Sequence, residues 1–304
     1  MVGLLFPGQG TQFVGMGKDL AGASAAAART WAEADDILGF ALSRLCFEGP
    51  EDELRATANA QPAILVHSIA AHRVMSERIG RAAFAAGHSL GELSAHVAAG
   101  TLCFADGVRA VRRRGELMQQ SGRDRPGTMA AILALDESAV EQACREASTA
   151  AEVCVLANYN APGQVVVSGD VAAVERVILL VKAAGARRAI PLSVSGAFHS
   201  PLMAPAQPEF AALLDTIPFA DPGIPVVSNV TGQPVREARL AGELLVRQLT
   251  APVRWTACIA TMVDGGVRSF FELGPGKVLT GLLRRIAADV EGRAIGTAAD
   301  ARAA

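Results

Sequence analysis

One serine lies in a sequence pattern that is typical of a catalytic nucleophile. The segment GHSLG at 87–91 fits G-x-S-x-G, and it stands between a short apolar stretch at 81–86 and a helical pattern at 92–99. A sharp turn from strand to helix would expose the hydroxyl of Ser89, because glycines tolerate the close approach of the chain there. The Leu90 N–H would then face a developing oxyanion. The alternative is a serine that only caps a helix.

A serine nucleophile needs a general base, which is most often a histidine. Of the five histidines, four fall in apolar helical patterns or would point away from Ser89: His67, His72, His88 and His96. His199 lies in a loop bounded by glycine and proline, just after a predicted strand. Such loops carry much of the catalytic machinery of α/β proteins, so His199 is the candidate base by elimination. The alternative is a loop histidine that only bonds to backbone groups.

Arg114 stands out from the run of arginines at 112–114 by its helical spacing. It follows Val111 by three residues and precedes Met118 by four, so it falls on the apolar face of a helix. A buried cation needs a partner. That partner is either an Asp or Glu of the chain or the carboxylate of a substrate, held by two parallel hydrogen bonds. The spacing alone does not choose between the two.

Composition excludes several classes of protein. Apolar residues make up 51% of the 304 residues, charged residues make up 19%, and the net charge is −2, so we expect a globular protein that binds no nucleic acid. We find neither an export signal nor a stretch long enough to cross a membrane. The five cysteines show no C-x-x-C pairing. We therefore expect no disulfide framework and no metal site, and we expect a cytoplasmic protein.

The order of the predicted elements indicates an α/β fold with an insertion. A buried strand is expected at 2–6 and another at 269–273, with helices between them. Residues 128–194 give the order βαββαβ, which is typical of a ferredoxin-like module. We predict a large domain formed by 1–126 and 195–304, and a small subdomain at 127–194. A polar linker is expected at 121–127, and the last seven residues, AADARAA, are expected to be frayed.

A set of segments, in one order along the chain, resembles the malonyl-CoA:acyl carrier protein transacylases, discrete acyltransferases of fatty acid or polyketide synthesis. These segments are FPGQG at 6–10, GHSLGE at 87–92, RRRGELMQ at 112–119, NYNAPGQVVVSG at 158–169, SGAFHS at 195–200, VRQL at 246–249 and ELGPGKVLTGL at 272–282. The resemblance implies a hydrolase-like α/β domain with an inserted ferredoxin-like subdomain, which agrees with the pattern above.

The resemblance also implies roles for the residues that match its motifs. Ser89 would be the nucleophile and His199 its base, oriented by the backbone carbonyl of Gln248. The N–H groups of Gln9 and Leu90 would form the oxyanion hole. The resemblance favours the substrate-binding role of Arg114, as the clamp on the free carboxylate of a malonyl group. Further substrate-binding positions would be Gln61, His88, Asn160 and Phe198, with Asn158 also near the cleft.

Two positions bear on the shape of the predicted pocket. Phe198 stands where malonyl-selective members of the family carry a bulky ring, which would leave no room for an α-methyl group. Leu93 departs from the family, because many members have an aromatic residue directly after GHSLGE.

The implied activity is the transfer of malonyl from malonyl-CoA to the thiol of a holo acyl carrier protein through a malonyl-serine, with no cofactor. Fatty acid synthesis is the first interpretation, and a trans-acting role in polyketide synthesis is the alternative. A serine esterase or thioesterase is a rival on the same fold, but such hydrolases place their histidine near the C-terminus, whereas His199 lies about a hundred residues before the end. A scaffold protein with an inactive site is a further rival, which intact Ser89, His199 and Arg114 disfavour.

Overall fold

Short apolar strands form the larger of two sheets in the computed structural model, which describes residues 1–304. The strands of this six-stranded sheet lie in the order β10-β9-β1-β2-β7-β8 and are parallel except for the β7–β8 pair. Their bounds are β1 Val2–Phe6, β2 Phe84–Gly87, β7 Val226–Val227, β8 Pro234–Val235, β9 Ser269–Leu273 and β10 Glu291–Ile295. Parallel strands are buried on both faces, which explains why β1 is apolar throughout.

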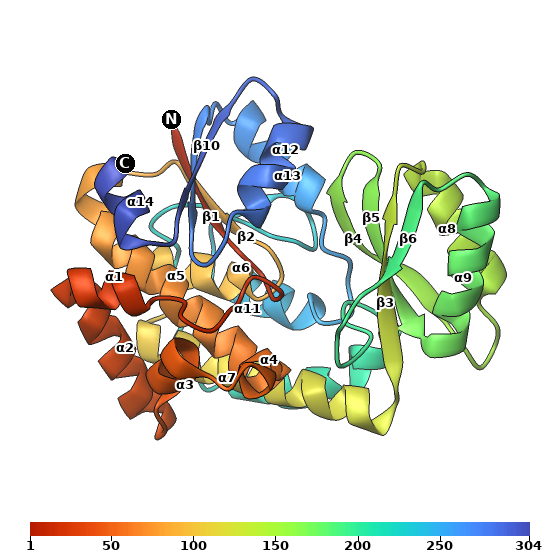
Figure 1. Ribbon diagram of the computed structural model, residues 1–304, viewed down its shortest axis with the longest axis horizontal. Coiled ribbons are helices and arrows are strands. Elements are labelled where there is room, and N and C mark those ends of the chain that lie inside the picture. Colours follow the sequence, from red (N-terminus) through yellow and green to blue (C-terminus); the bar gives the residue numbers. More distant parts are fainter.

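Helices cover both faces of this sheet, and alternate residues of β1 face different helices. Leu4 and Phe6 pack among residues of α5, α6 and α14, whereas Leu5 packs among residues of α12 and α13. The helices of this part (Figure 1) are α1 Lys18–Ala23, α2 Ala25–Leu38, α3 Leu42–Glu48, α4 Glu51–Arg55, α5 Thr57–Ile79, α6 Gly91–Ala98, α7 Phe104–Asp124, the 3-10 helix η1 Pro201–Ala206, α10 Gln207–Leu214, α11 Ala238–Arg247, α12 Trp255–Asp264, α13 Val278–Ile286 and α14 Ala298–Ala303. None of the helices combines the length and hydropathy needed to cross a bilayer.

The smaller sheet stands to one side of the larger one, in the green part of the ribbon (Figure 1). It is antiparallel, in the order β4-β5-β3-β6. Its elements are β3 Gly127–Leu133, α8 Glu137–Ala147, β4 Cys154–Ala161, β5 Gln164–Asp170, α9 Val171–Ala183 and β6 Arg188–Pro191. The helices α8 and α9 share one apolar cluster with the sheet. The predicted βαββαβ order is therefore confirmed, and we propose 127–194 as the small subdomain, with 1–126 and 195–304 as the large domain.

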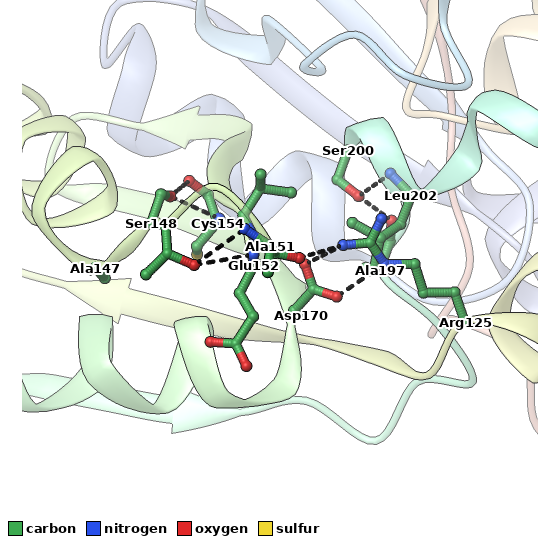
Figure 2. Close-up of polar contacts among 12 residues, drawn as sticks. Arg125, Ala147, Ser148, Ala151, Glu152, Cys154, Asp170, Ala197, Ser200 and Leu202 are labelled. Carbon is green, nitrogen blue, oxygen red and sulfur yellow. Dashed lines mark hydrogen bonds and ion pairs between the residues drawn. The ribbon is translucent and has the colours of Figure 1, made fainter.

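The two chain crossings between these parts lie side by side. A Cβ atom on Gly122 would stand 2.2 Å from the carbonyl oxygen of Ser195, so only glycine permits this approach of α7 to the returning chain. Just beyond, the Arg125 side chain points at Asp170 (Figure 2), with Nε and Nη2 donating to its carboxylate at 2.9 and 2.8 Å. Asp170 also accepts from the Val153 N–H at 2.8 Å. The carboxylate of Asp170, at the end of β5, thus joins the entry of the subdomain to the residue that precedes β4.

Two expectations are wrong, one about where helix α7 ends and one about the C-terminal residues. Helix α7 continues to Asp124, so residues 121–124 are its last turn and not part of a linker; Ser121 is buried and bonds to the Leu117 carbonyl. The C-terminal AADARAA is not frayed but forms α14. There Thr297 and Asp300 make reciprocal capping bonds, and Ala298 and Ala301 are buried. The strand β10 before it was not predicted.

Buried histidines make the stability of the fold sensitive to acid. Burial lowers the pKa of His96 to about 3, and neither of its ring nitrogens bonds to a protein group. Between the unfolded pKa near 6.5 and about 3, the unfolded chain binds a proton that the folded chain does not. The free energy of unfolding therefore falls as pH falls through this range, by up to about 1.4 kcal/mol per pH unit for each such histidine.

We expect His96→Leu to reduce this acid sensitivity, because it removes one site of proton uptake by the unfolded state. Urea unfolding at several pH values between about 7.5 and 4.5 measures the free energy of unfolding. In the variant, this free energy should decrease less steeply with falling pH than in the unchanged protein. The control is His72→Leu, at a partly exposed site on α5 where the change in slope should be smaller. An unchanged slope for His96→Leu would contradict the prediction.

Candidate active site

Ser89 lies on a strained turn between β2 and α6. Its φ angle is 54°, in the left-handed region that non-glycine residues rarely adopt. The flanking glycines are required by space: a Cβ atom on Gly87 would lie 1.8 Å from the Gly91 carbonyl oxygen, and one on Gly91 would lie 2.2 Å from that of Phe6. The G-x-S-x-G segment therefore has the strand–turn–helix context that a nucleophile of this type requires.

His199 lies against Ser89, although the two are 110 residues apart in sequence. Its Nε2 is 2.7 Å from Ser89 Oγ, and its Nδ1 is 2.9 Å from the backbone carbonyl oxygen of Gln248. Because a carbonyl only accepts, the proton of the neutral ring is on Nδ1, and Nε2 is free to accept the serine proton. Burial, and then the positive charge of Arg114, lower the pKa of His199 to about 3. The imidazole is therefore neutral at physiological pH.

Arg114 is buried beside the serine and pairs with no carboxylate. Its Nη1 donates to Gln61 Oε1 at 2.8 Å, and its Nη2 donates to Gln248 Oε1 at 2.9 Å and to Ser89 Oγ at 3.2 Å. No Asp or Glu oxygen lies within 4.0 Å, so the alternative of an internal salt bridge is wrong. Burial lowers the pKa of Arg114 to about 10, which leaves it charged at neutral pH. The site thus contains a cation without a counter-ion in contact.

Two residues that the sequence analysis did not single out as functional, Glu92 and Asn229, support the turn from behind. Asn229 Oδ1 accepts from the Ser89 N–H at 2.8 Å, and its Nδ2 donates to the Gly87 carbonyl at 2.8 Å. Glu92 Oε2 accepts from Gln248 Nε2 at 2.6 Å and from the Asn229 N–H at 3.1 Å. Glu92 ends the GHSLGE segment, so its position could have been noticed. Asn229 follows a two-residue strand, and no sequence signal marks it.

A cavity of about 540 Å³ lies over Ser89, between the large domain and the small sheet. Gln9 and Leu90 line it, and the backbone N–H of neither residue donates to a protein acceptor. The Gln9 side chain is turned elsewhere, with Nε2 donating to Thr57 Oγ1 at 3.1 Å. Both N–H groups are therefore free to donate to an oxygen atom in the cavity, as an oxyanion hole requires.

The remaining predicted pocket residues fall into two groups. Phe198, His88, Asn158 and Asn160 line the cavity, and His88 Nε2 lies 2.8 Å from Asn160 Oδ1, which links the turn to β4. Gln61 does not line the cavity but lies behind Arg114. Leu93, the departure from the family pattern, is fully buried in the core and also lies outside the cavity wall.

These groups together can perform one kind of chemistry. A hydroxyl bonded to a neutral imidazole can attack a carbonyl carbon, and two free N–H groups can stabilise the oxyanion that results. A buried guanidinium within 3.2 Å of the same hydroxyl favours an acyl group that carries a negative charge. The arrangement suits the transfer of an anionic acyl group.

Comparison with known proteins gives the same result. The family model described as acyl transferase domain matches residues 4–297. The chain is 46% identical to the malonyl CoA-acyl carrier protein transacylase of Bacillus subtilis (strain 168), over 94% of this chain and 90% of that protein. It is 46% identical to the transacylase of the same name from Escherichia coli (strain K12), over 93% and 91%.

Solved structures agree in fold as well as in sequence. An acyl carrier protein S-malonyltransferase from Vibrio cholerae superposes with a TM-score of 0.95 at 44% identity, covering 99% of both chains. A malonyl-transacylase solved in complex with a type II polyketide acyl carrier protein superposes with a TM-score of 0.96 at 43% identity, covering 99% of this chain and 97% of that one. The chain therefore belongs to the malonyl CoA-acyl carrier protein transacylase family of acyltransferases.

Proposed function

We propose that this protein transfers a malonyl group from malonyl-CoA to the phosphopantetheine thiol of an acyl carrier protein. The observation that carries the proposal is the position of Arg114, whose guanidinium reaches the nucleophile and has no carboxylate partner in the chain. Family membership supports the choice of acyl group and acceptor. The roles of the residues follow from their contacts.

In the first half-reaction, His199 Nε2 accepts the proton of Ser89 as Oγ attacks the thioester carbon of malonyl-CoA. The N–H groups of Gln9 and Leu90 donate to the oxyanion of the tetrahedral intermediate. The carbon–sulfur bond then breaks, and the sulfur of coenzyme A takes the proton back from His199. A malonyl ester remains on Ser89, and its carboxylate is paired with Arg114.

The second half-reaction repeats these steps with a different thiol. The phosphopantetheine thiol of the carrier gives its proton to His199 and attacks the ester, and Ser89 leaves with that proton. One thioester replaces another, so the exchange needs no oxidant, no nucleotide and no metal. The relative solved with a type II polyketide acyl carrier protein is an example of the enzyme–carrier pairing.

Selectivity for malonyl follows from the cost of leaving a buried cation unpaired. Acetyl lacks the carboxylate, so the Arg114 guanidinium would remain without a counter-ion in the acetyl complex. The side-chain oxygens of Gln61 and Gln248 accept hydrogen bonds from the guanidinium. Gln61 therefore orients Arg114 and does not line the cavity itself. The Phe198 ring occupies the cavity wall beside His199 and opposes an α-methyl branch.

We assign the protein first to fatty acid synthesis, and loading of polyketide carriers is the alternative. The transacylases of Bacillus subtilis and Escherichia coli support the family assignment, and the relative paired with a polyketide carrier supports the alternative. We also propose that the protein is cytoplasmic. All five cysteines are free, which fits a reducing compartment.

Replacing the nucleophile tests the proposed intermediate. We expect the unchanged protein, incubated with malonyl-CoA, to gain the mass of one malonyl group, and Ser89→Ala to gain none because no ester can form. Intact-protein mass spectrometry measures both. An adduct that persists in Ser89→Ala would end the assignment of this serine. Release of free malonate faster than transfer to a carrier would instead favour a thioesterase.

Replacing the clamp tests the choice of acyl group. Arg114→Met should lower kcat/KM for malonyl-CoA by about a hundredfold or more, because two charge-assisted hydrogen bonds to the acyl carboxylate are lost. The rate with acetyl-CoA should fall much less. The matched control is Arg113→Met, on the same helix, where the side chain is 43% exposed and pairs with Glu116 and Glu209. An equal loss for both acyl groups would contradict the role of Arg114.

A further inference from the structure

A buried carboxylate that takes no part in the proposed chemistry lies directly behind the nucleophile. Glu92 is fully buried in the first turn of α6, and it does not line the cavity. Burial raises its pKa to about 7, although hydrogen bonds from Asn229 and Gln248 and the charge of Arg114 act in the opposite direction. Burying an ionisable group is costly, so its contacts indicate what it contributes.

Glu92 is the acceptor at the centre of a carboxylate–amide cluster, formed by Glu92, Asn229 and Gln248. Its Oε2 accepts from Gln248 Nε2 at 2.6 Å and from the Asn229 N–H at 3.1 Å. Gln248 Nε2 also donates to the Ser89 carbonyl at 3.0 Å. The ionised carboxylate of Glu92 offers only acceptors, so in this form Glu92 selects the NH₂ side of the Gln248 amide over its oxygen.

The orientation of the Gln248 amide decides what Arg114 meets. With the NH₂ group held by Glu92, Gln248 Oε1 accepts from Arg114 Nη2 at 2.9 Å. The same Nη2 donates to Ser89 Oγ at 3.2 Å. If the amide turned over, its NH₂ group would face the guanidinium, donor against donor, and this bond would be lost.

We propose that Glu92 is a positioning residue: its carboxyl group fixes the Gln248 side-chain amide with the oxygen toward Arg114, and so holds the guanidinium in the orientation that receives the carboxylate of the acyl group. Glu92 touches neither the substrate nor the reacting atoms, and it acts through Gln248. This inference rests on the proposed function, because it concerns the malonyl carboxylate.

A second effect of Glu92 has the opposite sign. As an anion, Glu92 also repels the carboxylate of an incoming malonyl group. A substitution that removes the negative charge of Glu92 would by this effect make the reaction with malonyl-CoA faster. Hydrogen bonds of 2.6 and 2.9 Å join Glu92 to Gln248 and Gln248 to Arg114, whereas Glu92 does not line the cavity and its charge would act on a bound carboxylate only from a distance. The contacts therefore favour positioning over charge, and the two effects predict opposite results for one substitution.

Glu92→Gln tests this by comparing two reagents that attack the same serine. Acylation by malonyl-CoA requires the guanidinium, whereas sulfonylation by the neutral reagent phenylmethylsulfonyl fluoride requires only Ser89 and His199. Glutamine keeps the size of the side chain but can present either an NH₂ group or an oxygen. The Gln248 amide therefore loses the acceptor at 2.6 Å that selects its orientation and keeps only the Ser89 carbonyl at 3.0 Å. We expect the malonyl rate to fall by about tenfold or more and the sulfonylation rate by less than about threefold.

A second substitution keeps the proposal testable even if Glu92→Gln fails to fold. Gln248→Met removes the side-chain amide but keeps the backbone carbonyl that orients His199. It should lower the malonyl rate selectively, and adding Glu92→Gln to it should have little further effect, because both changes break the same connection. The matched control is Glu272→Gln, a buried carboxylate that accepts from the N–H groups of Leu279 and Thr280. It should lower the melting temperature and change both rates by the same factor.

Each outcome has a definite meaning. Selective loss of the malonyl reaction in Glu92→Gln and Gln248→Met supports the positioning role. An equal fall of both rates, no change, or a faster malonyl reaction in Glu92→Gln would overturn it, and the proposed function would stand. If the unchanged protein reacted with the sulfonyl fluoride but not with malonyl-CoA, the proposed function would fail, and this inference with it.

Discussion

The interaction on which the site depends is that between a buried guanidinium and groups that carry no charge. An ion in a protein interior loses its hydration, and the usual compensation is a counter-ion in contact. Arg114 has instead two amide oxygens and the serine hydroxyl. These partners accept hydrogen bonds from the two terminal nitrogens but carry no charge, and Glu92, whose charge raises the pKa of Arg114, is not in contact with the guanidinium. The charge is thereby available to the carboxylate of an acyl group, which would complete the pair.

The fold brings this cation to Ser89 by bringing together segments that are far apart in the chain. Ser89 follows β2, Arg114 lies on α7, and Gln248 ends α11, all in the large domain. His199 comes directly after the chain returns from the small sheet, and its φ angle is 57°. Strain at both Ser89 and His199 indicates that the surrounding contacts, and not local preference, hold the hydroxyl and the imidazole together. The small subdomain closes one side of the cavity and so belongs to the site.

Much of this arrangement could be predicted from sequence because it depends on local patterns. The spacing of Arg114 from Val111 and Met118 indicated a buried arginine, and the succession of predicted strands and helices in 128–194 indicated the βαββαβ order. The missing parts depend on long-range contacts. Asn229 accepts a hydrogen bond from the N–H of Ser89, 140 residues away in the chain, and nothing around Asn229 in the sequence marks it. The Ala-rich C-terminus resembles a frayed end, and only the cap at Thr297 and burial of Ala298 show why it is helical. Whether Arg114 met a carboxylate of the chain also could not be predicted from spacing.

We propose that Arg114 binds the carboxylate of the acyl group while Ser89 carries its ester. A crystal structure of the protein after reaction with malonyl-CoA tests this most directly. We expect an ester on Ser89 Oγ, with the acyl carboxylate accepting hydrogen bonds from both terminal nitrogens of Arg114 and the ester carbonyl oxygen facing the N–H groups of Gln9 and Leu90. An acyl chain whose carboxylate points out of the cavity, with the guanidinium still bonded only to protein groups, would contradict it.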